Sequence, residues 1–241
     1  MAALQPDPCA LLPFSAGQLT PMQAIEARHA VRSYTDEPLA SEAVEVLQKA
    51  IALVNEEANL NIQLVLDEPR AFTGFKARLV NFTNVRNYLA LVGPECKELD
   101  GIVGYYGEQL LLAQSLGLNS CWVGGTYKVV NRAYNVDLGQ KLAAVVALGY
   151  GASQGVPHRS KAPQEVAPGY DGAPEWFKRG VDAALLAPTA LNQQKFSFSL
   201  GGEENDVPVV RASTKRGAFT QMDLGIAQCH FEIGAGNVLY R

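Results

Sequence analysis

The chain has 241 residues, of which 48% are hydrophobic and 18% are charged, and its formal net charge is −4. A chain of this size can bury a core without metals or disulfides, and these proportions argue against intrinsic disorder. The small negative charge does not favour nucleic acid or an anionic membrane as a partner.

The residue types that most often make disulfides and metal sites are few and widely spaced: Cys9, Cys96, Cys121, Cys229, His29, His158 and His230. They form no CxxC or HxxxH pair, so we expect neither a disulfide framework nor a metal site. No basic region precedes an apolar run at the N-terminus, and no apolar stretch approaches the ~20 residues of a membrane-spanning helix. We therefore expect a cytoplasmic protein with no membrane partner.

The first elements follow from capping and spacing. Residues 1–19 contain three prolines and no clear period, which indicates an extended lead-in. A short helix then begins after Thr20, whose hydroxyl forms a capping box with Gln23 around Pro21, and it ends near Arg28 or His29.

The central part of the chain alternates between helical and strand patterns. A helix begins at Ser41, and alternation predicts strands at 62–66 and 88–92. Residues 105–116 predict a nearly all-apolar, buried helix. The continuous apolar run at 142–148 predicts a strand covered on both faces.

The last third begins with a linker and returns to regular structure. Residues 151–173 are rich in glycine, proline and charge. A helix follows from Pro174 to about Leu186, then strands near 196–200 and 207–210. An apolar helix at 222–233 carries His230 and Glu232, which we interpret as structural.

Two segments have the same order of helix, break, Asn-x-Gln and strand. They are AIALVNEEANLNIQLVL and VDAALLAPTALNQQKFSF, in which Asn61 and Gln63 match Asn192 and Gln194. Chance similarity explains a match of two residues as well as an internal repeat does. If the repeat is real, two half-domains share one sheet system.

Four short clusters are candidates for chemistry. Arg28 and Arg32 lie four residues apart beyond a capped helix, where two guanidinium groups suit one phosphate; a solvated basic turn is the alternative. The amides of the loop at 187–194 suit the edge of a heterocycle, or alternatively satisfy one another. Paired glycines after Cys121 allow a flat ligand to approach the backbone. The loop at 157–163 is basic, so its charge could support a developing anion; a solvated linker is the alternative.

Taken in order, these clusters resemble the nitroreductase family. The segments that carry the resemblance are AIEARHAVRSYTDEPL, EQLLLAQSLGLNSCWVGG, VVALGYGASQGVPHRSKAP and LLAPTALNQQKFSF. The last segment comes late in this chain, whereas in ordinary members it follows the first helices. The sequence therefore resembles most closely the subgroup in which one chain folds as an internal pseudo-dimer.

The resemblance implies an α+β fold, in which a central mixed or antiparallel sheet is flanked by helices and two related halves form one chain. The implied division is a lead-in at 1–19, a first half at 20–150, a linker at 151–173 and a shorter second half at 174–241. It also implies one FMN per chain, and either a monomeric pseudo-dimer or a weak homodimer.

The resemblance further implies which residues bind the flavin. Arg28, His29 and Arg32 would hold the FMN phosphate and ribityl chain, with Ala30 where the family often has serine. The isoalloxazine and its reactive edge would be lined by the remaining predicted residues: Asn84, Gly124, Gly125, Pro188, Thr189, Asn192 and Gln194. Arg159 and Lys161 would lie by the phosphate or the pyrimidine carbonyl. Lys195 and Phe196 replace the usual Pro-Trp.

The function implied is that of an FMN-dependent oxidoreductase. Hydride would pass from NADH or NADPH to a small nitroaromatic-like or quinone-like acceptor by a ping-pong route, with no catalytic side chain and no metal. A flavin enzyme acting on a different acceptor is a close alternative. The main alternative is a non-catalytic protein of the same fold that binds flavin or another small ligand.

Overall fold

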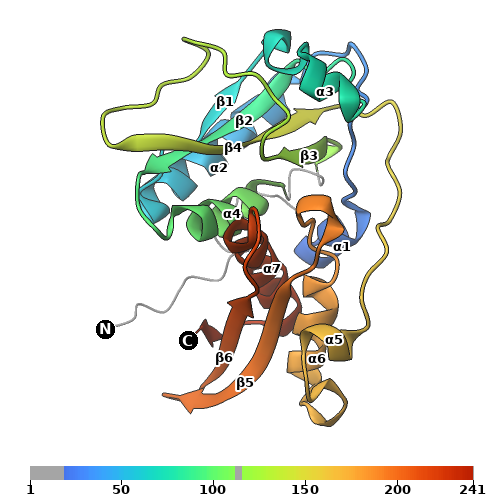
Figure 1. The fold of residues 1–241 in the computed structure, drawn as a ribbon, viewed down its shortest axis with the longest axis vertical. Helices are drawn as coiled ribbons and strands as arrows, with labels where there is room; N and C mark the ends of the chain where they lie inside the picture. Colours follow the sequence, from blue (N-terminus) through green and yellow to red (C-terminus); the bar gives the residue numbers. More distant parts are fainter. Residues whose placement is uncertain (1–18, 112–115, 241) are drawn as a thin grey trace.

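The computed structural model describes residues 19–111 and 116–240 (Figure 1). Its helices and strands, in chain order, are α1 Pro21–Ala27, α2 Ser41–Ala58, β1 Gln63–Val65, η1 Pro69–Phe72, α3 Phe75–Leu79, β2 Asn87–Pro94, α4 Leu99–Leu110, β3 Asn119–Val123, β4 Gln140–Gly149, α5 Pro163–Val166, η3 Tyr170–Gly172, α6 Glu175–Ala184, η4 Ala190–Asn192, β5 Phe196–Glu204, β6 Val207–Thr214, α7 Thr220–Ala235 and β7 Leu239–Tyr240. The predicted α+β class is confirmed, with sheets flanked by helices.

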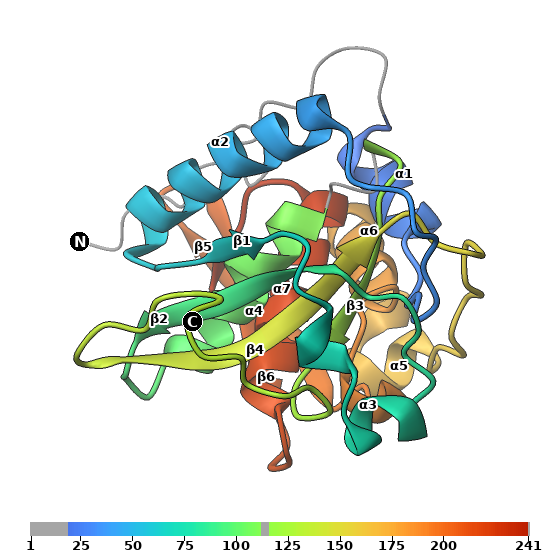
Figure 2. The ribbon, with the colours of Figure 1, turned by 90° about the horizontal axis from the view of Figure 1, so that it is seen from above.

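The strands form two sheets. The larger has the order β1-β2-β4-β3 with every neighbour antiparallel. The smaller has the order β5-β6-β7, in which β5 and β6 are antiparallel and β7 joins β6 in parallel. In Figure 1 helices α4 and α7 lie between the two sheets, and Figure 2 looks down on the larger sheet with α4 and α7 behind it and α2 along the β1 side.

The larger sheet is buried on both faces because its central strands are almost entirely apolar. Leu89 and Leu91 of β2 pack into a core shared with α2, α4, α6 and α7. Their neighbours Tyr88 and Ala90 point to the opposite face, into a second core with Phe72 of η1. Strand β4 contributes to both cores in the same alternating way, as predicted for 142–148.

The capping box predicted for α1 is confirmed. The Thr20 hydroxyl accepts from the Gln23 N–H at 3.2 Å, and the Gln23 side chain accepts from the Thr20 N–H at 2.9 Å. Pro21 begins the helix, and Arg28 is its C-cap. Local sequence therefore decides where α1 begins.

Several predicted boundaries differ from the structure, among them those of α4 and β2. Helix α4 starts at Leu99, six residues before the predicted start at Tyr105, because Gly101 and Gly104 interrupt the apolar pattern. Glycine at 104 lets the backbone of α7 approach closely. Residues 112–115 of the predicted helix, like residues 1–18 of the predicted lead-in, lie outside the described part. Strand β2 also continues through Pro94 rather than stopping before Gly93.

Candidate functional site

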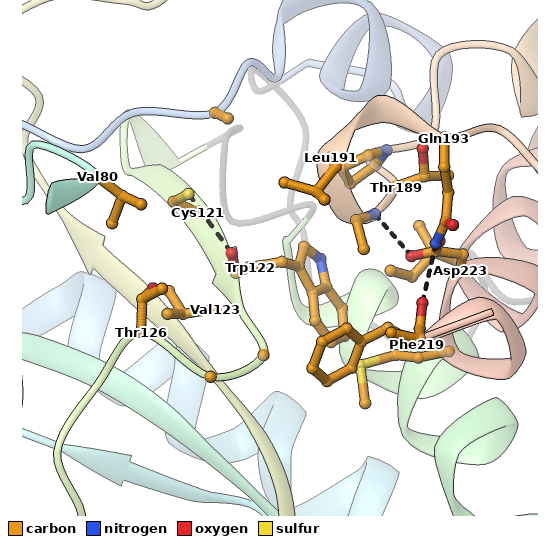
Figure 3. Close-up of a pocket in the computed structure, with 18 of the residues that line it drawn as sticks. Val80, Cys121, Trp122, Val123, Thr126, Thr189, Leu191, Gln193, Phe219 and Asp223 are labelled. Atoms are coloured by element: carbon orange, nitrogen blue, oxygen red, sulfur yellow. Dashed lines mark hydrogen bonds between the residues drawn. The ribbon is translucent and has the colours of Figure 1, made fainter. Parts of the chain in front are cut away.

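A cavity of about 520 Å³ lies between the larger sheet and the start of α7 (Figure 3). This volume is in the range typical of small-molecule sites. One wall comes from the segment after α1, the end of β3 and the turn that follows, and the chain near α3: Arg28, Ala30, Arg32, Val80, Phe82, Cys121, Trp122, Val123, Gly124, Gly125 and Thr126. The opposite wall comes from the loop before β5 and the start of α7: Pro188, Thr189, Ala190, Leu191, Gln193, Ala218, Phe219, Met222, Asp223 and Ile226.

Six of the twelve predicted site residues line this cavity: Arg28, Arg32, Gly124, Gly125, Pro188 and Thr189. Residues far apart in the sequence meet here because the segment after α1 runs beside β3. Ala30 pairs with Ser120, and the Val31 N–H donates to the Ser120 carbonyl at 3.0 Å. This pairing brings the arginine segment next to the glycine turn that follows β3.

The other six predicted residues do not belong to the cavity lining: His29, Asn84, Arg159, Lys161, Asn192 and Gln194. The Gln194 amide donates to the Arg159 carbonyl at 2.9 Å and accepts from the Lys161 N–H at 2.9 Å. The Asn192 amide donates to the same carbonyl at 2.8 Å. These amides therefore join the loop before β5 to the basic loop, and His29 and Asn84 lie elsewhere.

The two predicted glycines differ in their surroundings. A Cβ atom on Gly124 would lie 2.5 Å from the ring of Phe219, so this ring rests directly on the glycine backbone. A Cβ on Gly125 would have nothing within 4 Å. Figure 3 shows the rings of Trp122 and Phe219 projecting between the two walls. A flat ligand therefore has open space at Gly125, with aromatic rings beside it.

The wall formed by the loop before β5 is held in an unusual backbone conformation. Leu191, Asn192, Gln194 and Phe219 all have positive φ angles, which cost free energy for residues other than glycine. Such strain concentrates at functional sites, where the surrounding structure maintains it. Leu191 is also fully exposed at the cavity although it is apolar.

Asp223 is the carboxylate of the cavity wall. It accepts from the Ala190 N–H at 2.9 Å and from the Gln193 side chain at 2.6 Å, and so anchors the loop before β5 to α7. Burial raises the pKa of Asp223, and these two hydrogen bonds partly oppose the shift.

Arg28 and Arg32 place positive charge at the other side of the cavity. Burial lowers the pKa of His29, as does the neighbouring charge of Arg28. Burial lowers the pKa of His158, a hydrogen bond to the Leu185 carbonyl opposes this shift, and the charges of Arg28, His29 and His230 lower the pKa further. Burial raises the pKa of the Cys121 thiol against the opposing effect of Arg32 and Arg28. The arginine side of the cavity thus suits an anionic group.

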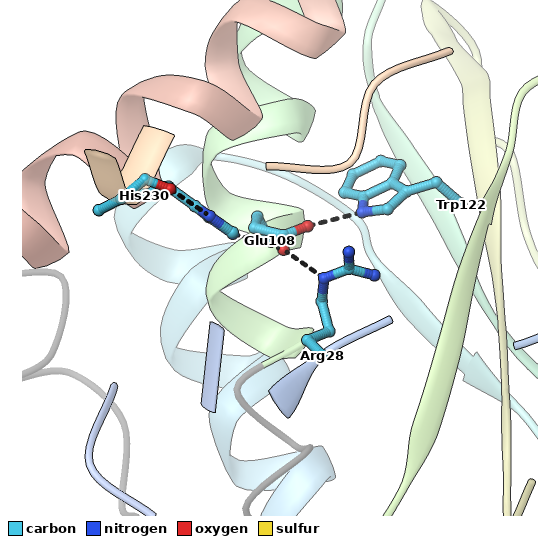
Figure 4. Close-up of polar contacts among 5 residues, drawn as sticks. Arg28, Glu108, Trp122 and His230 are labelled. Atoms are coloured by element: carbon cyan, nitrogen blue, oxygen red, sulfur yellow. Dashed lines mark hydrogen bonds and ion pairs between the residues drawn. The ribbon is translucent and has the colours of Figure 1, made fainter. Parts of the chain in front are cut away.

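Two charged residues at or next to the cavity were absent from the sequence prediction, Asp223 and Glu108. Glu108 of α4 is only 2% exposed and binds Arg28, Trp122 and His230 (Figure 4). The prediction passed over it because it stands in an otherwise apolar helix. A lone carboxylate within such a run is the signal that could have found it, since a buried charge needs partners.

Within residues 19–111 and 116–240, no three His, Cys, Asp or Glu side chains are grouped so as to hold a metal ion. The helices of this same described part include none that is long and apolar enough to cross a membrane.

Comparisons with known proteins agree with this fold. The model of the family described as "Putative TM nitroreductase" matches residues 20–235. The chain therefore belongs to this nitroreductase family, a family of oxidoreductases. No curated protein matches the sequence.

Among solved structures, the chain is similar to a putative nitroreductase of Thermotoga maritima MSB8, with 17% identity and a TM-score of 0.63 over 91% of this chain and 85% of that one. A putative nitroreductase of Desulfovibrio desulfuricans in complex with FMN matches 61% of this chain and 95% of its own length, with 21% identity and a TM-score of 0.47. A putative NADH dehydrogenase/NAD(P)H nitroreductase of Parabacteroides distasonis matches 60% and 96%, with 19% identity and a TM-score of 0.47.

Proposed function

We propose that the protein binds one FMN in the cavity and transfers hydride from NADH or NADPH to a small oxidised acceptor, nitroaromatic-like or quinone-like, by a ping-pong route. Membership of the nitroreductase family gives the reaction class. The observation that carries the cofactor assignment is Arg28, which lines the cavity and has a buried Nη1 without a hydrogen-bond partner among the described residues. A buried guanidinium nitrogen without a partner suits a phosphate oxygen.

The shape and chemistry of the cavity support the same cofactor. Arg28 and Arg32 would bind the phosphate, and the open space at Gly125 would let a flat ring approach the backbone. Bound FMN would supply the redox chemistry, and the protein would supply orientation and charge. No side chain is needed as acid or base. Because the proposed route is ping-pong, the nicotinamide and the acceptor would use the same open space in turn.

We also propose that the halves at 20–150 and 174–241, joined by the linker at 151–173, are related. The support comes from equivalent contacts of the two Asn-x-Gln segments. The Gln63 amide donates to the Asn135 carbonyl at 2.7 Å and accepts from the Asn135 N–H at 2.8 Å. The Gln194 amide likewise donates one hydrogen bond to the basic loop and accepts one from it. One flavin per chain and a monomeric or weakly dimeric state follow from this proposal.

The proposal is tested by purifying the protein, loading it with FMN and recording its visible absorbance before and after anaerobic NADH or NADPH. We expect about one FMN per chain and bleaching of the flavin absorbance by a nicotinamide. Binding without bleaching would favour a non-catalytic flavin-binding protein. A protein that cannot be loaded with FMN would overturn the cofactor assignment.

A further inference from the structure

Four elements bring their polar side chains to one buried point beside the cavity (Figure 4). Glu108 of α4 accepts from the Trp122 indole N–H at 2.7 Å and lies 2.9 Å from His230 Nε2 of α7. Arg28, the C-cap of α1, places its Nε 3.6 Å from the same carboxylate. Glu108 is 2% exposed, His230 is fully buried and Arg28 is 4% exposed.

The second ring nitrogen of His230 fixes the number of protons in this cluster. Its Nδ1 lies 3.2 Å from the Ala183 carbonyl oxygen, and a carbonyl can only accept. Nδ1 therefore carries a hydrogen. The contact between Nε2 and Glu108 needs one hydrogen too, carried either by the imidazole or by the carboxyl group.

Both positions of this hydrogen give the same total charge. An imidazolium next to a carboxylate is neutral as a pair, and so is a neutral imidazole next to a carboxylic acid. His230 thus neutralises Glu108 in either case. The positive charge of Arg28 is then left without compensation from the carboxylate that orients it.

Within the described part of the chain, Glu108 is the acidic side chain that forms an ion pair with Arg28, and no second one supplies that compensation. His29, His158 and Arg32 are the neighbouring ionisable groups whose charges act on this region, together with the buried Cys121 thiol. Asp223, on the opposite wall, is occupied by Ala190 and Gln193. An uncompensated buried guanidinium is costly, so an anion from the cavity would be favoured next to it.

We propose that Glu108 and His230 are positioning residues, which share a proton so that Glu108 orients Arg28 and Trp122 without neutralising Arg28. Arg28 is thereby left with one positive charge for an anionic group of the bound ligand. The identity of that group as the FMN phosphate rests on the proposed function. The charge of the cluster does not.

The first test uses the ligand-free protein and needs no variant. The ¹⁵N chemical shifts of the His230 ring distinguish a protonated nitrogen from one with a lone pair. We expect a protonated Nδ1 and a second hydrogen shared between Nε2 and Glu108. A hydrogen on Nε2 alone, with a lone pair on Nδ1 and an ionised Glu108, would overturn the proposal.

The second test compares FMN with riboflavin, which lacks the phosphate. His230→Gln keeps a donor for Glu108 but removes the shared proton, so Glu108 becomes a full countercharge for Arg28. We expect FMN affinity to fall roughly 10-fold to 100-fold, as for a lost charge-assisted hydrogen bond, with little change for riboflavin.

Glu232→Gln is the matched control, because it removes a buried carboxylate from the same helix that hydrogen-bonds Tyr105 and does not line the cavity. It should leave the ratio of FMN to riboflavin affinity unchanged. An equal loss of both ligands in His230→Gln would indicate a structural role and overturn the proposal. If the wild-type protein binds neither ligand, the proposed function fails, while the ¹⁵N shifts still decide the charge of the cluster.

Discussion

Leu191 has a left-handed backbone conformation, with φ 53° and ψ 24°, and a fully exposed side chain at the cavity. For a leucine this conformation costs about 1–2 kcal/mol, and an exposed leucine gains nothing from burial in return. The Ala190 N–H bonded to Asp223 maintains the loop in this shape. A residue that costs stability in this way is better explained by a bound ligand than by folding.

Leu191→Gly tests this explanation. Because glycine adopts positive φ freely, we expect the free energy of unfolding to be unchanged or to rise by up to about 1 kcal/mol. We expect FMN affinity to fall, since the apolar contact with the ligand is lost. Urea unfolding and flavin titration measure the two effects. Leu138→Ala is the control, since Leu138 is equally exposed but lies outside the cavity lining. A clear loss of stability in Leu191→Gly would contradict the explanation.

The adjacent glycines of the turn after β3 provide a matched pair. In Gly124→Ala the new methyl group would lie 2.5 Å from the ring of Phe219, and we expect a loss of about 1–3 kcal/mol in the free energy of unfolding. Gly125→Ala places its methyl group in open space and should change stability by less than about 0.5 kcal/mol. Adding Phe219→Ala to Gly124→Ala should restore part of the loss in urea unfolding. Equal effects of the two single substitutions would show that the ring is not held on Gly124.

At the scale of elements, close contact between α4 and α7 positions Glu108 opposite His230. A Cβ on Gly104 would lie 2.2 Å from the Met222 carbonyl oxygen, so the two backbones nearly touch there. Gly101 lies one turn earlier on α4. A Cβ on Gly101 would lie 3.7 Å from the nearest atom, the Gln221 carbonyl oxygen, which is an ordinary contact. A Cβ on Gly225 of α7 would lie 2.1 Å from the Gly101 carbonyl oxygen, so the backbones also nearly touch at that point. The close approach of the two helices therefore needs glycine at 104 and 225, whereas position 101 has room for a side chain.

We expect Gly104→Ala to lower the free energy of unfolding by about 1–3 kcal/mol or more, because the helices must separate. Gly101→Ala should be neutral or stabilise the protein by up to about 1 kcal/mol, because alanine favours the helix. Thermal unfolding compares the two variants directly. If Gly101→Ala lowers the free energy of unfolding as much as Gly104→Ala does, the close approach of the helices does not depend specifically on glycine at position 104.

Elements with strong local signals could be predicted from the sequence. The capping box at Thr20 and Gln23 fixes the start of α1, and continuous apolar residues fix β4. The start of α4 could not be predicted, because Gly101 and Gly104 have low helix propensity, and the advantage of glycine at 104 appears only in its packing on α7. Contacts between distant segments, such as Gln194 with the basic loop, are likewise set by the fold and not by local pattern.

At the scale of the whole molecule, buried tyrosines couple stability to alkaline pH. Burial raises the pKa of Tyr34, Tyr105 and Tyr240 above the ordinary value. The unfolded chain releases these protons near pH ~10 whereas the folded chain retains them. The unfolded state then binds fewer protons, so the free energy of unfolding falls as the pH rises above about 10.

We therefore expect ionisation of these tyrosines to coincide with unfolding in alkali, when tyrosinate absorbance and circular dichroism are followed together. Each buried tyrosine should contribute about 1.4 kcal/mol per pH unit to the slope. Tyr34→Phe should reduce the slope of unfolding free energy against pH by about 1.4 kcal/mol per pH unit. It also removes the hydrogen bond to the Val31 carbonyl. Full ionisation near pH 10 with the fold retained would contradict this prediction.

The sequence by itself determined most of the helices and strands, because these depend on periodicity and capping, and the four clusters that resemble the nitroreductase family, because these are local motifs. The resemblance in turn implied the α+β class. Only the tertiary structure decided that Arg28, Gly125 and Thr189 share one cavity while Asn192 and Gln194 turn to the basic loop. It alone also placed Glu108 between Arg28 and His230. The physical reason is that a buried charge is stabilised by partners from distant segments, and the fold brings α7, β3 and the end of α1 to Glu108 of α4.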